Sequence, residues 1–118
     1  MMKIAIPVKT DKENPILSPL FGKAKWFAFV EEGKVKIEKN EEQGGVRVVD
    51  WLFEKGIDAL IISHMGNSPY TYIKEGSDIS IFYAGEERIS LEEVMKKFED
   101  ETLVIVDDSN SAKIIRNH

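Results

Sequence analysis

The stretch Ala59-Leu60-Ile61-Ile62-Ser63-His64-Met65-Gly66-Asn67-Ser68-Pro69 predicts a buried strand, a turn and the start of a helix. Residues 59–62 form a continuous apolar run, which is typical of a strand covered on both faces of a parallel sheet. Ser68 followed by Pro69 indicates an N-cap and a first helical position, and Gly76 ends that helix. We therefore expect 59–62 to be a central strand of an open α/β sheet.

The first third of the chain predicts another strand of this sheet and a hairpin. Residues 3–8 form a short β-branched run, and residues 26–30 and 34–39 flank the polar turn Glu31-Glu32-Gly33. Within 34–39, Val35 and Ile37 alternate with charged side chains, which indicates that one face of this strand meets water. We expect an antiparallel hairpin at one edge of the sheet.

Two more helices are indicated by periodicity and by their end signals. Apolar residues recur at helical spacing from Val46 to Phe53, before the stop signal Lys55-Gly56. Ser90-Leu91-Glu92-Glu93 is a capping box, in which Glu93 is placed to reach back to the N-cap. The apolar residues that follow this box supply one stripe of a third helix.

The second half of the chain adds two strands. Residues 79–83 form the next strand, and residues 103–106 indicate an extra strand, followed by a turn and a short helix or tail over 109–118. Because connections between successive strands are short and right-handed, we expect 3–8, 59–62 and 79–83 to be adjacent and parallel. The pattern thus predicts an α/β fold.

Length and composition limit what the chain can be. With 118 residues, of which 42% are hydrophobic, it can build one core of ordinary size, so a single domain over 1–118 is expected. No apolar run reaches the roughly 20 residues of a membrane span, and the N-terminus leads straight into a strand rather than a signal peptide. We expect no membrane partner and a cytoplasmic location. Because the chain has no cysteine, it offers no thiolate to zinc or to an iron-sulfur cluster.

The charge distribution argues against nucleic acid as a partner. The net charge is −5, and the acidic excess lies after residue 59, where the chain has six Lys or Arg and eleven Asp or Glu. Nucleic acids are bound largely through Lys and Arg that neutralise phosphates, and an acidic chain without a basic stripe does not supply them. Charged residues make up 31% of the chain, mostly Glu and Lys, which suits a thermophilic source.

Three turns that contain glycine form the candidate ligand site: Gly44-Gly45 and Gly66-Asn67-Ser68, which open helices, and Phe21-Gly22. Ligands of open α/β sheets bind at loops that leave the carboxyl ends of strands. Two of the turns open helices, whose free N–H groups and positive dipole ends attract anions, and the third would add an apolar, positively charged lip. Glycine and cap residues also begin helices for purely structural reasons, so that alternative stays open. The expected ligand-binding residues are Phe21, Gly22, Lys23, Gly44, Gly45, Arg47, Gly66, Asn67 and Ser68.

His64 is the candidate metal ligand, because it follows the predicted central strand at the end where the loops converge. The alternative is a loop histidine that hydrogen-bonds the backbone. Met65 offers a thioether beside it but is more typical of a residue that fills a gap in the core. The other histidine, His118, is terminal. A Ser63–His64 catalytic pair is not supported, because neighbouring side chains at a strand end point apart.

Four motifs resemble the dinitrogenase iron-molybdenum cofactor biosynthesis family, which includes the NifX-like proteins. The family's first strand is matched by Lys3-Ile4-Ala5-Ile6-Pro7, and its His-Phe-Gly-Arg-Ala-like turn by Leu20-Phe21-Gly22-Lys23-Ala24. Its Gly-x-Gly-Val-Arg-like helix start is matched by Gly44-Gly45-Val46-Arg47, and its strand ending in a Gly-x-Ile-Gly-like turn by Ile62-Ser63-His64-Met65-Gly66-Asn67-Ser68. The resemblance covers 2–98 as a core and leaves 99–118 as a C-terminal extension. It implies a mixed five-stranded sheet of the ribonuclease H-like type flanked by helices, with the C-terminal extra strand in addition.

The resemblance also implies a function. Family members of known role bind or carry iron-sulfur-containing precursors of the nitrogenase cofactor and share no catalytic set, so the implied cofactor is such a precursor and no enzyme is expected. A ribonuclease H-type nuclease is excluded, because strands 3–8 and 59–62 carry no Asp or Glu for metal ions. This chain has Leu20 where many members have His, which removes one candidate cluster ligand. Lys23 replaces the usual Arg and keeps the charge.

Two hypotheses follow for the function. The first is a non-catalytic carrier module for a small anionic ligand or a metal cluster, held at the loops after the parallel strands. The alternative is a structural or protein-interaction domain in which the ligand site has decayed and a surface contacts a partner, either a second copy in a homodimer or another protein. Uptake of an iron-sulfur cofactor would favour the first hypothesis, and a stable, colourless dimer the second.

Overall fold

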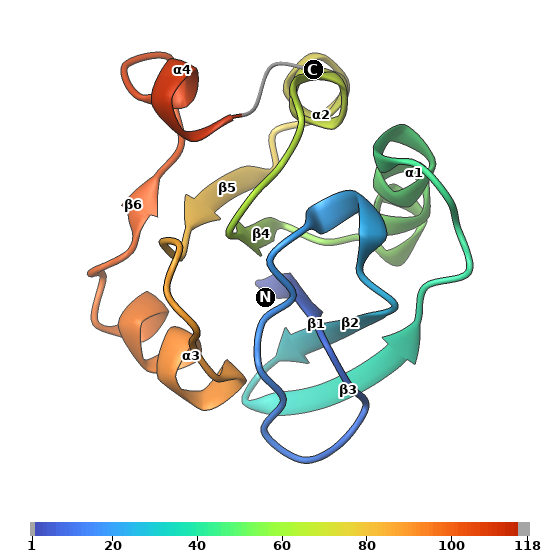
Figure 1. Cartoon of the computed structure of the whole chain (residues 1–118), viewed down its shortest axis with the longest axis vertical. Coiled ribbons are helices and arrows are strands. Elements are labelled where there is room, and N and C mark those ends of the chain that lie inside the picture. Colours follow the sequence, from blue (N-terminus) through green and yellow to red (C-terminus); the bar gives the residue numbers. More distant parts are fainter. Residues whose placement is uncertain (1, 116–118) are drawn as a thin grey trace.

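The computed structural model describes residues 2–115, which form a mixed sheet with helices on both faces (Figure 1). The strands are β1 (Lys3–Val8), β2 (Trp26–Glu31), β3 (Lys34–Lys39), β4 (Ala59–Ile62), β5 (Ser80–Tyr83) and β6 (Val104–Ile105). The helices are η1 (Phe21–Lys23), α1 (Gly45–Lys55), α2 (Asn67–Gly76), α3 (Leu91–Glu99) and α4 (Ser111–Ile114). The single α/β domain expected from the sequence is confirmed. Its sheet has six strands rather than five, because the extra strand β6 joins the same sheet.

The strand order is β3-β2-β1-β4-β5-β6. β4 pairs in parallel with β1 and with β5, in the registers Ile4↔Ala59 and Ala59↔Ser80. β2 pairs antiparallel with both β1 and β3, so the hairpin extends the sheet beyond β1. The predicted adjacency of the three parallel strands is confirmed, and all four residues of β4 are fully buried, as a central strand requires.

Two apolar cores lie on opposite faces of the sheet. Val48, Val49 and Leu52 of α1 and Ile73 of α2 pack on one face, and Leu91 and Val94 of α3 pack on the other. Each helix therefore buries the apolar stripe that its sequence predicts. Within residues 2–115, no helix is long and apolar enough to cross a membrane.

The helix ends follow their sequence signals, with one correction. α1 ends at Lys55, and its C-cap Gly56 has a left-handed φ of 71°. α3 begins with the predicted capping box at Ser90. Ser68, however, is not the N-cap of α2: the cap is Gly66, whose carbonyl accepts a hydrogen bond from the Tyr70 N–H at 3.3 Å. Pro69 is thus the third helical residue, a position whose N–H has no partner within the helix, so proline is tolerated there.

Two edge strands differ in detail from the expectation. The predicted strand 103–106 is reduced to Val104–Ile105, and both side chains are about half exposed. In β3, Val35 is 51% exposed although the alternation places it on the apolar face, because α3 covers that face only in part. His118 lies outside the described residues.

Candidate functional site

The segment before η1 is fixed to the carboxyl end of β4. Leu20 and His64 form a parallel bridge, in which the Phe21 N–H donates to the His64 carbonyl and the His64 N–H donates to the Pro19 carbonyl, each at 3.0 Å. The sequence places these segments more than forty positions apart. The bridge brings η1 beside the turn that carries His64.

Phe21 anchors η1 to the core. Its side chain is only 1% exposed and meets the Phe27 ring edge to face, with the ring centroids 5.7 Å apart. Phe27 in turn contacts Trp51 of α1 in the same geometry. Phe21 is therefore a buried anchor beneath the turn, rather than part of an exposed lip.

Glycines allow η1, α1 and α2 to approach closely. A Cβ added at Gly45 would lie 2.7 Å from Cγ of Pro69, so only glycine fits at the first helical position of α1. A Cβ at Gly22 would lie 3.5 Å from the Gly45 nitrogen, an ordinary contact. Gly44 has a φ of 93°, which L side chains rarely adopt. The starts of α1 and α2 thus converge on η1.

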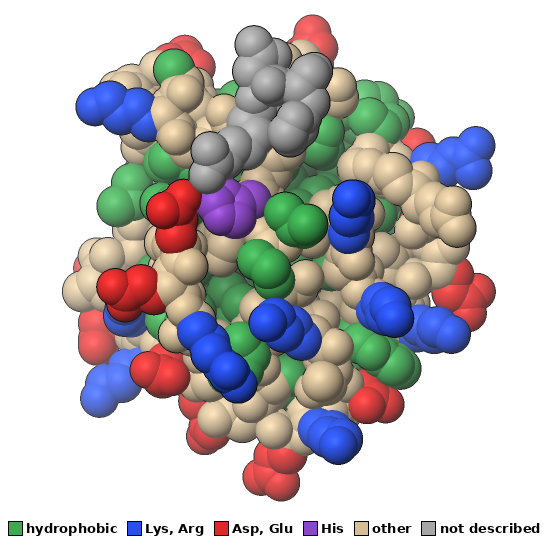
Figure 2. Space-filling model, viewed as in Figure 1, with side chains coloured by type: hydrophobic (Ala, Val, Ile, Leu, Met, Phe, Trp, Pro, Cys, Tyr) green, Lys and Arg blue, Asp and Glu red, His purple; other side chains and the backbone are tan. Residues whose placement is uncertain are grey.

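A cavity of about 360 Å³ lies where these three segments meet. Six of the predicted site residues line it, together with three others that the sequence did not assign to binding. The lining residues are Leu20, Phe21, Gly22, Lys23, Gly45, His64, Met65, Gly66 and Pro69. Figure 2 shows the histidine on this face, with an acidic side chain against it and hydrophobic and basic side chains nearby.

Four predicted site residues do not line this cavity. Gly44 is the N-cap of α1, and Arg47 is exposed in the first turn of that helix. Ser68 is exposed in the first turn of α2, and Asn67 faces a different hollow, between α2 and α4. The structure therefore brings six of the predicted residues together at one cavity, and these four lie outside its lining.

The positive groups at the cavity come from one lysine and from two helix starts. Among the described residues, Lys23 is the only Lys, Arg, Asp or Glu that lines it. No described side chain caps α1 or α2, and neither helix has an acidic residue in its first turn. The starts of both helices reach this cavity through Gly45 and Gly66, and neither helix has a carboxylate of its own in its first turn.

His64 has a neighbour that the sequence analysis missed. Its Nε2 lies 3.9 Å from Oε1 of Glu86, and its side chain is 22% exposed. Glu86 follows β5, the parallel strand next to β4, so the rule that ligands gather at carboxyl ends could have pointed to it. Within residues 2–115, no three His, Asp or Glu side chains lie close enough together to hold a metal ion.

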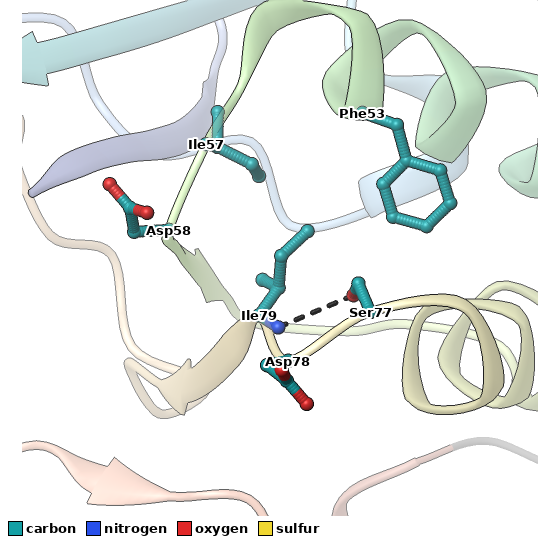
Figure 3. A pocket seen from close by; sticks show the side chains of 6 residues that line it. All are labelled: Phe53, Ile57, Asp58, Ser77, Asp78 and Ile79. Carbon is teal, nitrogen blue, oxygen red and sulfur yellow. Dashed lines mark hydrogen bonds between the residues drawn. The ribbon is translucent and has the colours of Figure 1, made fainter.

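A second hollow of about 360 Å³ lies at the opposite edge of the sheet. Figure 3 shows that the carboxylates of Asp58 and Asp78 point away from the space between Phe53 and Ile79. Asp58 accepts a hydrogen bond from the Lys3 N–H at 2.8 Å, and the Ser77 hydroxyl donates to the Ile73 carbonyl at 2.9 Å. Two of its polar groups therefore hold the fold together, and we place the candidate site at the carboxyl edge.

Fold and cavity together define a small α/β domain with a candidate ligand site at the carboxyl edge of its parallel strands. Residues 2–101 match the family model described as dinitrogenase iron-molybdenum cofactor, and the chain belongs to that family. A comparison with curated proteins finds no match.

Several solved structures share the fold. A protein from Thermotoga named as a NifB protein has 24% identity and a TM-score of 0.74, with 87% of this chain and 91% of that chain covered. The apo orange protein from Desulfovibrio gigas has 15% identity and a TM-score of 0.78, with 90% and 93% covered. A Methanocaldococcus jannaschii protein named as a dinitrogenase has 20% identity and a TM-score of 0.69, with 90% and 95% covered. At these identities the structures show the fold alone.

Proposed function

We propose that the protein is a non-catalytic carrier that binds a small anionic ligand or a metal cluster in the cavity at the carboxyl edge. The observation that carries the proposal is the convergence of two helix starts, neither capped by a described side chain, on a cavity that Lys23 lines. Backbone N–H groups and a lysine ammonium are the donors that an anion needs. Membership of the family supports a precursor of the iron-molybdenum cofactor as the cargo.

The residues present suit a cluster that brings its own inorganic ligands. The chain has no cysteine, so protein thiolates cannot hold the metal. The sulfide or oxide ligands of the cargo would instead accept hydrogen bonds from backbone N–H groups at Gly45 and Gly66, the residues of the two helix starts that line the cavity. Lys23 would add charge, and His64 is the side chain in the cavity that can form a metal–nitrogen bond. Arg47, outside the lining, would act through its charge alone.

The experiment compares a cluster with a simple oxyanion. The apo protein is incubated anaerobically with Fe²⁺ and sulfide, and cluster uptake is followed by visible absorption. Molybdate binding is measured separately by calorimetry. We expect His64→Ala to weaken cluster uptake by more than about tenfold, because a metal bond is lost, and to leave molybdate binding nearly unchanged.

Lys23→Gln tests the charge in the same two assays. It should weaken both ligands by roughly two- to fivefold, which is the effect of one charge near a helix terminus. Lys25→Gln is the matched control, because Lys25 is exposed nearby but does not line the cavity. If the wild type takes up neither the cluster nor molybdate, the carrier proposal is wrong and the interaction-domain hypothesis gains support.

A further inference from the structure

β3 is an edge strand whose outer side has no partner among the described residues. Its apolar face is incompletely covered: Val35 is 51% exposed and Ile37 is partly exposed. A hollow of about 600 Å³ lies between β3 and α3, and its apolar lining includes Val30, Leu91 and Met95 as well as these two side chains. This part of the surface therefore combines free backbone groups with exposed apolar side chains.

The hairpin turn determines which backbone groups of β3 face outward. Glu32 and Gly33 have φ values of 53° and 77°, as in a two-residue type I′ turn. Such a turn makes Glu31 and Lys34 the first hydrogen-bonded pair, and these pairs then alternate along the ladder. Lys34, Lys36 and Glu38 thus bond to β2. The N–H and C=O groups of Val35, Ile37 and Lys39 point away from the sheet.

We propose that this edge is a homodimer interface, in which β3 pairs antiparallel with β3 of a second copy across a two-fold axis at Ile37. In this register the outward groups of Val35, Ile37 and Lys39 form a second ladder, and Ile37 lies opposite Ile37 of the partner subunit. In the same register Val35 lies opposite Lys39 of the partner subunit, and the two Ile37 side chains contact each other.

Charge selects this register over the neighbouring one. With the axis at Ile37, Lys36 lies opposite Glu38 of the partner subunit, and the pair occurs twice. With the axis at Lys36, Lys34 would lie opposite Glu38 of the partner subunit, but the two Lys36 side chains would also lie directly opposite each other, which is destabilising. Lysines on an edge strand commonly prevent pairing. Here Glu38 lies opposite Lys36 of the partner subunit, so the charges favour the register with its axis at Ile37.

Glu38 is prepared for such a pair. Its Oε1 accepts a hydrogen bond from Lys55 Nζ at 2.6 Å, and its Oε2 lies 4.0 Å from the exposed ammonium of Lys36. The hydrogen bond from Lys55 lowers the pKa of the Glu38 carboxyl further below neutrality. The second oxygen is therefore charged and able to accept Lys36 of the partner subunit.

The dimer would leave the proposed ligand site intact. A two-fold axis at Ile37 reverses the strand direction in the second copy, so the two carboxyl edges face opposite ways. Each cavity would remain complete within its own chain. The dimer does not depend on the carrier function, and a failure of either proposal leaves the other standing.

The first test is the association state of the whole chain by sedimentation equilibrium, up to roughly millimolar protein. We expect a concentration-dependent dimer for the wild type. Val35→Pro removes one outward N–H in each copy but no bond to β2, a position where an edge strand tolerates proline. It should weaken the dimer by about tenfold or more. Val35→Thr keeps the N–H group and should retain the dimer.

A charge exchange tests the register itself. Lys36→Glu places two carboxylates opposite each other, and Glu38→Lys places two ammonium groups opposite each other, so each variant alone should be monomeric. Mixed together, the two variants should form a heterodimer, because both pairs between positions 36 and 38 are then again of opposite charge. Circular dichroism establishes that both variants are folded.

Three results would overturn the proposal. The first is a wild type that stays monomeric at every concentration, which would leave the edge to a strand of a different protein. The second is a dimer that Val35→Pro does not weaken, because the interface then lies elsewhere. The third is a pair of folded charge variants that do not associate when mixed although Val35→Pro has broken the wild-type dimer, because the register is then wrong.

Discussion

Side chains accept hydrogen bonds from the first backbone N–H groups of α3, whereas no described side chain does so at the starts of α1 and α2. At α3, the Ser90 hydroxyl accepts from the Glu93 N–H at 3.2 Å, and the Glu93 carboxylate accepts from the Ser90 N–H at 3.4 Å. Asn14, far away in sequence, accepts from the Glu92 N–H at 2.8 Å. At α1 and α2 the caps are Gly44 and Gly66, and no described side chain accepts from either helix start.

The two kinds of helix start differ in whether a described side chain caps them. α3 has Glu92 and Glu93 in its first turn, so the chain itself compensates the positive dipole end. α1 and α2 have no acid there, and their starts meet at the cavity beside Lys23. We call the capped start of α3 the closed start, and the starts of α1 and α2, which no described side chain caps, the open starts. The closed start stabilises the fold, and the proposed function depends on the open starts.

A side chain added at Gly45, in the open start of α1, should change the free energy of unfolding most. In Gly45→Ala the new Cβ would lie 2.7 Å from Pro69 Cγ, so α1 and α2 must move apart, at a cost of about 1–3 kcal/mol in the free energy of unfolding. Thermal unfolding should show this as a lower midpoint. Gly22→Ala is the control, because its Cβ would meet its neighbours at ordinary distances of 3.5 and 3.6 Å. Equal stability of the two variants would show that this close approach does not matter.

Removing the cap of α3 should have the next largest effect on the free energy of unfolding. Ser90→Ala removes the capping box and should lower the free energy of unfolding by about 1 kcal/mol, measured by urea denaturation. Ser68→Ala is the matched control at an open start, and it should have almost no effect, because Ser68 is exposed and is not the cap of α2. A loss of stability in Ser68→Ala similar to that in Ser90→Ala would contradict the contrast between the two kinds of helix start.

Local signals were enough to predict most of the fold. The apolar run 59–62 gave the central strand, and the capping box at Ser90 gave the start of α3. The prediction failed where two local signals competed. Ser68 and Pro69 are a strong start signal, but the helix already begins at Asn67 because the Tyr70 N–H bonds to the Gly66 carbonyl.

The cavity could be predicted only in part. The rule for carboxyl ends of parallel strands brought the turns at Gly22, Gly45 and Gly66 together correctly. The rule does not say which of their neighbours face inward. Arg47 is exposed and does not line the cavity, and the contact between Gly45 and Pro69 depends on packing between two helices. Such contacts depend on tertiary packing, which has no signal in a single sequence.

A carboxylate added to an open start should have the smallest effect on stability and should separate stability from binding. Val46 is 36% exposed in the first turn of α1, so Val46→Glu places a negative charge at the positive dipole end. The free energy of unfolding should rise by about 0.3–1 kcal/mol, as α1 comes to resemble α3. Molybdate binding should weaken by roughly two- to fivefold, because the new charge competes with the anion for the same donors. Val46→Gln controls for the change of side chain without the charge. A Val46→Glu variant that is more stable and binds molybdate as tightly as Val46→Gln would show that the open start of α1 does not contribute to the site.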